Sequence, residues 1–139
     1  MRKYTLLTFL LVFTMLFSFA QGTNTKTVKP VNTPTVSPDA IKFSDSNKEE
    51  EIIVDGKDVL LSGNDNKLTF KGAIGKILIT GKDNDITIVT VNKITVTGNG
   101  NFVSWEKSTT ANGKPVVEDK GGYNNIEKRS SDAIERSDN

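Results

Sequence analysis

Two carboxylates in neighbouring glycine- and asparagine-rich segments are the side chains of this sequence best suited to chemistry. Asp65 lies in the segment GNDN (63–66), and Asp83 lies in the segment GKDN (81–84). Glycine-rich repeats of this kind hold Ca²⁺ in some β-proteins, and Ca²⁺ takes six to eight oxygen ligands, several of them charged. Asp65 and Asp83 are therefore weak candidates for metal ligands.

Two related segments further along the chain weaken that hypothesis. GNGN (98–101) and GGYN (121–124) place Gly100 and Tyr123 where the earlier segments have an acid. Because only half of the segments keep a carboxylate, polar corners that hold no metal are the favoured interpretation. A calcium-dependent fold, or a hydrolase that uses the turn carboxylates, is the alternative.

The absence of histidine and cysteine restricts the other kinds of chemistry. The chain has no imidazole base, no thiol nucleophile and none of the usual zinc ligands. The triplet Glu49–Glu51 is predicted to lie in a solvated loop, because consecutive residues of an extended chain point to opposite faces and do not converge on a cation. We therefore expect no catalytic residue and no cofactor.

The four segments are units of one repeat. An asparagine follows each glycine after three places, an aliphatic residue follows it after five, and another precedes it by four. The repeated pairs are Gly63 and Asn66, Gly81 and Asn84, Gly98 and Asn101, and Gly121 and Asn124. In the last unit Asp119 and Lys128 stand where earlier units have apolar residues. A period that fades at one end is typical of a repeat array with a capping unit.

Between these segments the pattern predicts β-strands throughout. Apolar residues, many of them β-branched, alternate with Ser, Thr, Lys or Asp, as in Asp85–Ile88. This period of two indicates half-buried strands, and no stretch has helical spacing over a useful length. The glycines and asparagines are expected to form corners because they tolerate a positive φ. The predicted fold class is therefore all-β.

Two all-β architectures fit the repeat. In an antiparallel meander each Gly-x-x-Asn segment is a hairpin turn, whereas in a parallel β-solenoid each period is one coil and the corners stack. The solenoid is favoured, because stacked asparagines can form a ladder of hydrogen bonds and a hairpin has no need of asparagine at one fixed place. The irregular second corner favours the meander, since residues 91–94 are compatible with a tight hairpin.

The run ITVTGNGNFVSW (94–105), followed by GKPVVEDKGGYNNIEK (113–128), resembles a bacterial exported family catalogued as domain of unknown function 3060. Units of that family carry a Val-x-Val-x-Gly-x-x-Asn-x-Val pattern, and a proline precedes the final Gly-x-x-Asn. The resemblance covers about residues 52–128. It implies an exported β-repeat domain and no activity. Some members have cysteines near the first units, and this chain has none.

The start of the chain predicts export. Arg2 and Lys3 precede an apolar run of fourteen residues, and small residues surround a cleavage site after Ala20, so residues 1–20 are predicted to be a signal peptide. The run is shorter than the roughly 20 residues of a membrane span. The protein is therefore predicted to be periplasmic or secreted, with no integral membrane span after cleavage.

The composition of the predicted mature chain argues against nucleic acid as a partner. Removal of the signal peptide takes two of the 18 basic residues, which leaves 16 against 17 acidic residues and a net charge of −1. Residues 21–40 form a Thr/Pro-rich linker, residues 41–128 form the β-repeat domain, and residues 129–139 form a polar tail predicted to be disordered. A near-neutral domain has no electrostatic reason to bind nucleic acid or an anionic membrane.

Aromatic residues provide the remaining indication of a binding surface. By the alternation, Trp105 shares a face with Phe70 and Ile88 and is expected in the core. Phe102 occupies an outward position and Tyr123 lies in a corner, so both are predicted to be available to a sugar or a protein. We therefore expect a non-catalytic exported module with a binding or structural role, whose partner is a protein or glycan of the cell envelope.

Overall fold

The computed structural model describes residues 35–130, which all belong to one unit of the chain, residues 32–139. The predicted signal peptide, most of the predicted linker and the tail from residue 131 lie outside the described residues. The elements are β1 (Ile41–Phe43), β2 (Glu49–Asp55), β3 (Val59–Leu61), β4 (Lys67–Ile79), β5 (Asp85–Val96), β6 (Phe102–Lys107), β7 (Val116–Asp119) and β8 (Asn125–Lys128). Within this range no helix is long and apolar enough to cross a membrane.

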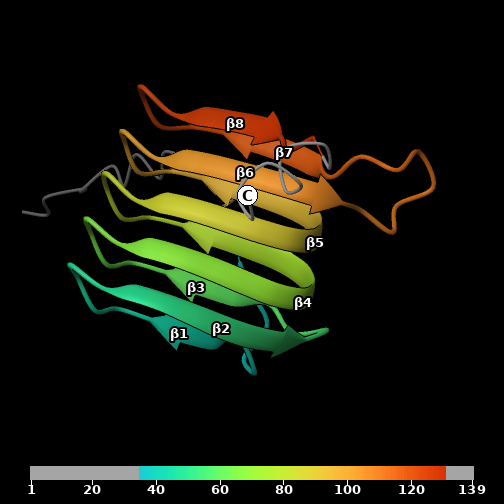
Figure 1. Ribbon diagram of the computed structural model, residues 1–139, viewed down its shortest axis with the longest axis horizontal. Coiled ribbons are helices and arrows are strands. Elements are labelled where there is room, and N and C mark those ends of the chain that lie inside the picture. The colour runs from blue at the N-terminus through green and yellow to red at the C-terminus, as the bar shows by residue number, and fades with distance from the viewer. Residues whose placement is uncertain (1–34, 131–139) are drawn as a thin grey trace, which may run out of the picture. The chain divides into compact units, whose positions relative to one another are not determined.

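The strands wind as a parallel β-solenoid. Figure 1 shows the coils stacked one above another, with β1 and β2 at one end and β7 and β8 at the other. Every paired strand is parallel to its neighbour, so the solenoid prediction is confirmed and the meander alternative is wrong. Residues 91–94, which the meander would use as a hairpin, continue through β5.

The register places equivalent residues of successive coils above one another and builds the core from them. The buried rows include Val59, Ile77 and Ile94 on one side, and Leu68, Ile86 and Val103 on the other. Burial of each such side chain stabilises the fold by about 1.5–3 kcal/mol. Trp105 continues the row of Phe70 and Ile88 and is 7% exposed, which confirms its predicted place in the core.

The first coil is formed by β1 and β2, and there the sequence-based prediction is wrong. Glu49–Glu51 do not lie in a loop but begin β2, in register with residues 67–69 of β4. Pairing with β4 overrides their polar character, and Glu49 forms an ion pair with Lys67 at 2.7 Å. The hydrogen bond that Lys67 donates to Glu49 raises the pKa of Lys67.

Glu50 occupies an unusual place in this first coil. It is in register with the buried Leu68, so it stands in a row that is apolar in the following coils. Glu50 is nevertheless exposed, because the first coil has a neighbour on one side alone among the described coils. A carboxylate in a core row is therefore tolerated at the end of the stack.

Candidate functional site

In each corner the third residue has a left-handed backbone conformation. The angle φ is 55° at Asp65, 54° at Asp83, 70° at Gly100 and 58° at Tyr123. The repeat glycines, which are the first residues of the corners, have no positive φ. The interpretation of these glycines as positive-φ residues is therefore wrong.

Glycine is required at the first place because neighbouring coils approach closely there. A Cβ atom on Gly81 would lie 1.8 Å from the carbonyl oxygen of Gly63, and a Cβ on Gly98 would lie 1.7 Å from that of Gly81. No side chain fits so close to backbone atoms, so the glycines of the repeat serve the packing of coil on coil.

The corner asparagines form a continuous hydrogen-bond ladder along the stack. Nδ2 of Asn84 donates to the carbonyl oxygen of Gly63 at 3.0 Å and to Oδ1 of Asn101 at 2.9 Å. Its Oδ1 accepts from the backbone N–H of Asn66 at 3.1 Å and from Nδ2 of Asn66 at 3.0 Å. The same arrangement links Asn101 to Asn124. Because Asn66, Asn84 and Asn101 are at most 2% exposed, these amides are not available to a ligand.

Two departures from the repeat complete the last coil. Nδ2 of Asn124, which has no further asparagine to bind, donates to Oδ1 of Asp119 at 2.9 Å, and the same oxygen accepts the N–H of Gly121 at 3.0 Å. Nζ of Lys128 lies 5.6 Å from the centroid of the Trp105 ring, which is a cation–π contact. Asp119 and Lys128 therefore place polar groups over the end of the ladder and of the core.

A second set of hydrogen bonds joins the outer edges of the corners, and sequence reasoning missed it. Oδ1 of Asn64 accepts the N–H of Lys82 at 2.9 Å, and Oδ1 of Asn99 accepts the N–H of Gly122 at 2.8 Å. The sequence feature that could have revealed these bonds is the short polar side chain at the second place of these corners. The asparagine side chains of the corners thus support the fold.

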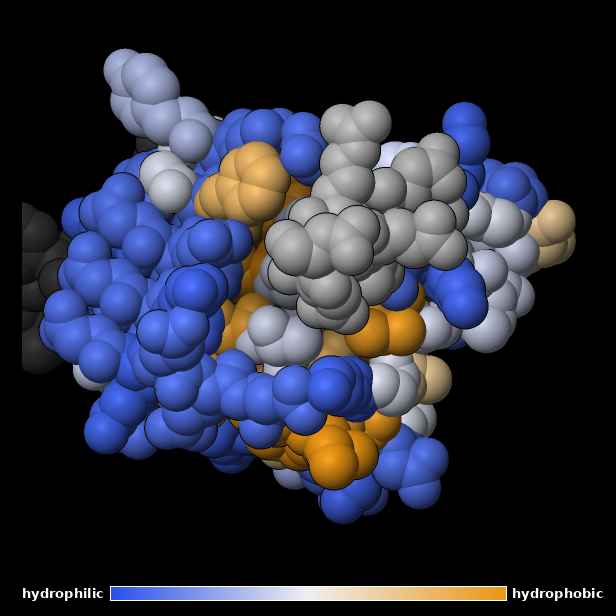
Figure 2. Space-filling view, in the orientation of Figure 1, coloured by the Kyte–Doolittle hydropathy of each residue, from blue (hydrophilic) through white to orange (hydrophobic). Residues whose placement is uncertain are grey.

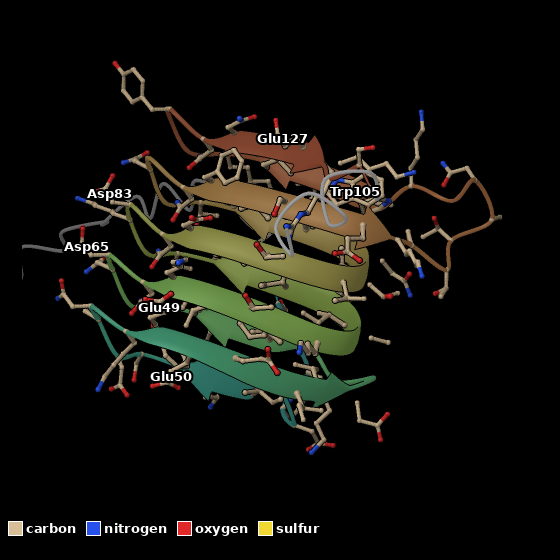
Figure 3. All side chains as sticks on the ribbon, in the orientation of Figure 1. Glu49, Glu50, Asp65, Asp83, Trp105 and Glu127 are labelled. Carbon is tan, nitrogen blue, oxygen red and sulfur yellow. The ribbon has the colours of Figure 1, made fainter. Side chains whose placement is uncertain are left out.

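The structure places the two candidate metal ligands on adjacent coils. Figure 3 shows Asp65 and Asp83 on the corner side of the stack, away from the core. The carboxylate of Asp83 extends toward Gly100 of the next coil, where an added Cβ would lie 2.2 Å from its Oδ1. Within residues 35–130 no group of three or more acidic side chains is arranged to hold a metal ion.

Calcium is therefore expected to leave the stability of the domain unchanged. A site filled at a hundred times its dissociation constant would stabilise the native state by about 2.7 kcal/mol and raise the melting temperature. We expect thermal melts in millimolar calcium and in chelator to coincide for the native chain and for an Asp65→Asn, Asp83→Asn double variant. A calcium-dependent rise that the double variant loses would contradict this expectation.

Among the other described carboxylates, Glu118 has two close cationic partners. Glu118 lies 2.5 Å from Nζ of Lys93 and 3.4 Å from that of Lys120. The hydrogen bond from Lys93 lowers the pKa of Glu118, whereas a general acid of a glycoside hydrolase needs a raised pKa. Glu118 is therefore held ionised as part of a surface ion pair.

The two aromatic residues proposed from the sequence both lie at the surface of the last coils. Phe102 is 38% exposed and Tyr123 is 99% exposed. Phe102 is in register with Asp85 on one side and Asn125 on the other. Tyr123 stands at the third place of its corner, where Asp65 and Asp83 stand in earlier corners. Figure 2 shows hydrophilic residues covering most of the corner side of the stack, so exposed aromatic rings are exceptional there.

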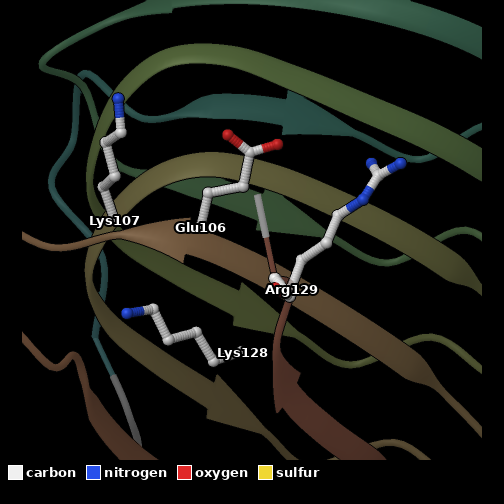
Figure 4. Close-up of a pocket in the computed structure, with 5 residues that line it drawn as sticks. Glu106, Lys107, Lys128 and Arg129 are labelled. Carbon is white, nitrogen blue, oxygen red and sulfur yellow. The ribbon is translucent and has the colours of Figure 1, made fainter. Parts of the chain in front are cut away.

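A cleft that the sequence did not reveal lies at the other end of the last coils. It has a volume of about 420 Å³ and is lined by Glu106, Lys107, Lys128, Arg129 and Ser130 (Figure 4). Glu106 and Lys107 end β6, Lys128 ends β8, and Arg129 and Ser130 follow it toward the second corner, where the spacing of the repeat is irregular. We call this feature the cationic cleft.

The stacked corners and the parallel register define a small parallel β-solenoid held by an asparagine ladder. Residues 61–123 match the model of the family described as "Protein of unknown function (DUF3060)". The match confirms the resemblance inferred from the sequence. No curated protein and no solved structure matches the chain.

Proposed function

We propose that this protein is a non-catalytic exported module that binds a protein or glycan of the cell envelope through Phe102 and Tyr123. The predicted signal peptide (1–20) supports export, and the absence of histidine and cysteine supports a non-catalytic role. We call the surface formed by Phe102 and Tyr123 the aromatic corner.

The backbone of Tyr123 is the observation that carries this proposal. The left-handed conformation costs a non-glycine residue about 1–2 kcal/mol and is a marked outlier for a bulky side chain. The Tyr123 ring is 99% exposed, so no packing within the fold offsets that cost. The third residues of the other Gly-x-x-Asn corners share this conformation but are Asp or Gly, so the bulky exposed ring sets this corner apart, and strained residues cluster at functional sites.

The surroundings of Tyr123 suit a ligand with an apolar face and polar edges. In the row of Phe102 the two preceding coils carry the charged residues Lys67 and Asp85. The aromatic corner thus presents apolar area where earlier coils present charge. Aromatic rings pack on the faces of sugars or on apolar side chains, and the tyrosine hydroxyl adds a hydrogen bond.

Replacement of Tyr123 by glycine is expected to separate stability from binding. Glycine adopts the left-handed conformation without steric cost, so Tyr123→Gly should raise the free energy of unfolding by about 0.5–1 kcal/mol after the loss of chain entropy is included. The same change should weaken binding in a screen of envelope glycans and proteins, because it removes the exposed ring. Denaturant titration and a binding assay measure the two effects.

Asp65→Gly is the matched control. It removes the steric cost of the same left-handed conformation in a corner without an aromatic residue, so it should stabilise the domain and leave binding intact. Equal binding by native protein and Tyr123→Gly would contradict the role of the aromatic corner. Reproducible turnover of a substrate, abolished by a point substitution, would contradict the non-catalytic role.

A further inference from the structure

We propose that the cationic cleft binds the acidic groups of an anionic polysaccharide, which names the ligand class of the proposed function and rests on it. The cleft is lined by three cationic side chains, Lys107, Lys128 and Arg129, and by one carboxylate, Glu106. These residues leave an excess of two positive charges around the cavity. Its volume of about 420 Å³ falls within the roughly 300–1,000 Å³ typical of small-molecule sites.

The cations of the cleft differ from the paired lysines of the neighbouring coils. Lys67, Lys71, Lys93 and Lys120 each lie within 3.4 Å of a glutamate oxygen. Over residues 35–130 no such ion pair involves the three cations of the cleft. Glu106 and Arg129 follow the paired residues Trp105 and Lys128, yet they form no salt bridge.

The fold positions the side chain of Lys128 and the backbone of Arg129. Lys128 is held over the ring of Trp105, and the backbone N–H of Arg129 donates to the carbonyl oxygen of Trp105 at 2.7 Å. A guanidinium group binds a carboxylate or sulfate through two parallel hydrogen bonds, and a lysine adds a charged donor. An oxyanion in the cleft would therefore meet charged donors, and among the described lining residues Glu106 is the one carboxylate.

The distance between the cleft and the aromatic corner favours a polymer as the ligand. Phe102 begins β6 and Lys107 ends it, so the two sites are separated by five residues, or about 16 Å of extended strand. One extended glycan can stack a sugar ring on the aromatic corner and place an acidic group in the cleft. The near-neutral charge of the predicted mature chain argues against a general affinity for membranes or nucleic acids.

Titration of the full mature chain with a polyuronate tests this inference. The control ligand is the same polymer with its carboxylates methyl-esterified, which keeps the sugar rings and removes the charge. We expect the acidic polymer to bind in a salt-sensitive manner, at least tenfold more tightly than the ester. The double variant Lys107→Gln, Arg129→Gln, which leaves Lys128 over Trp105, should lose that preference.

A double variant of two exposed lysines outside the cleft, Lys57→Gln and Lys114→Gln, removes the same charge and should keep the preference. Equal weakening in both double variants, no binding of the polyuronate, or tighter binding to anionic lipid vesicles would overturn the proposal. Equal binding of acid and ester polymers, lost in Tyr123→Gly, would overturn the cleft and leave the aromatic corner standing. Inorganic phosphate is added as a competitor at equal charge concentration. If it displaces the acidic polymer, a free oxyanion is enough for binding, and the proposal of a polymer as the ligand is overturned.

Discussion

Replacement of Gly81 by alanine is expected to destabilise the domain by about 3–5 kcal/mol. The added carbon would lie 1.8 Å from the carbonyl oxygen of Gly63, and neither atom belongs to a side chain that can rotate away. The two coils would have to separate, which breaks the ladder and the strand pairing on both sides. Denaturant unfolding followed by circular dichroism measures the loss.

Gly56→Ala provides the control for this prediction. Gly56 has a φ of 69° and nothing within 4 Å of an added Cβ, so alanine there should cost about 1–2 kcal/mol from backbone strain alone. If Gly81→Ala were no more destabilising than Gly56→Ala, the close approach of the coils would not be the reason for glycine in the corners.

Replacement of Asn84 by alanine is expected to cost about 3–4 kcal/mol. The change removes the hydrogen bonds of Asn84 to Gly63 and Asn101 and those it accepts from Asn66. Buried groups left without partners cost about 1–3 kcal/mol each, and water cannot reach a residue that is 1% exposed without opening the corner. Equilibrium unfolding in urea measures the effect.

Asn64→Ala is the matched control for the ladder. Asn64 lies in the neighbouring corner, and its side chain accepts a single hydrogen bond, from the N–H of Lys82 at 2.9 Å, in an exposed position. Its loss should cost about 1 kcal/mol or less, because water can replace the acceptor. Similar losses for Asn84→Ala and Asn64→Ala would show that the buried ladder does not hold the corners together.

The repeat was predictable because its signals are local in the sequence. Glycine and asparagine recur at fixed places, and the alternation between them sets which side chains face the core. The same alternation predicted the exposed position of Phe102 and the buried position of Trp105. The asparagine ladder was predictable because stacked corners place equivalent asparagines next to one another, where their amides can form hydrogen bonds.

The first coil could not be predicted from the same pattern, for a physical reason. Asp45 and Lys48 stand where later corners have glycine and asparagine. Glycine is needed where a preceding coil approaches, and the ladder asparagine bonds to groups of the preceding coil. Since no described coil precedes the first, neither residue is required, and the signal of the repeat disappears where its cause is absent.

The cationic cleft was missed because no repeated pattern encodes it. Its lining comes from the second corner, whose length differs from coil to coil, and from two strands that are 23 residues apart in register. Lys107 and Arg129 do not lie in a distinctive motif of the sequence. Only the stacking of β8 on β6 brings them together.

Each coil pairs with its immediate neighbours alone, and this affects how the protein unfolds locally. Stability in such a stack is the sum of interfaces between adjacent coils, so a terminal coil, which has one interface, unfolds locally at a lower cost than a central one. Tyr123 and Arg129 both flank β8, the final strand. A partner bound to them would stabilise one of the two terminal coils and keep its own binding surface folded.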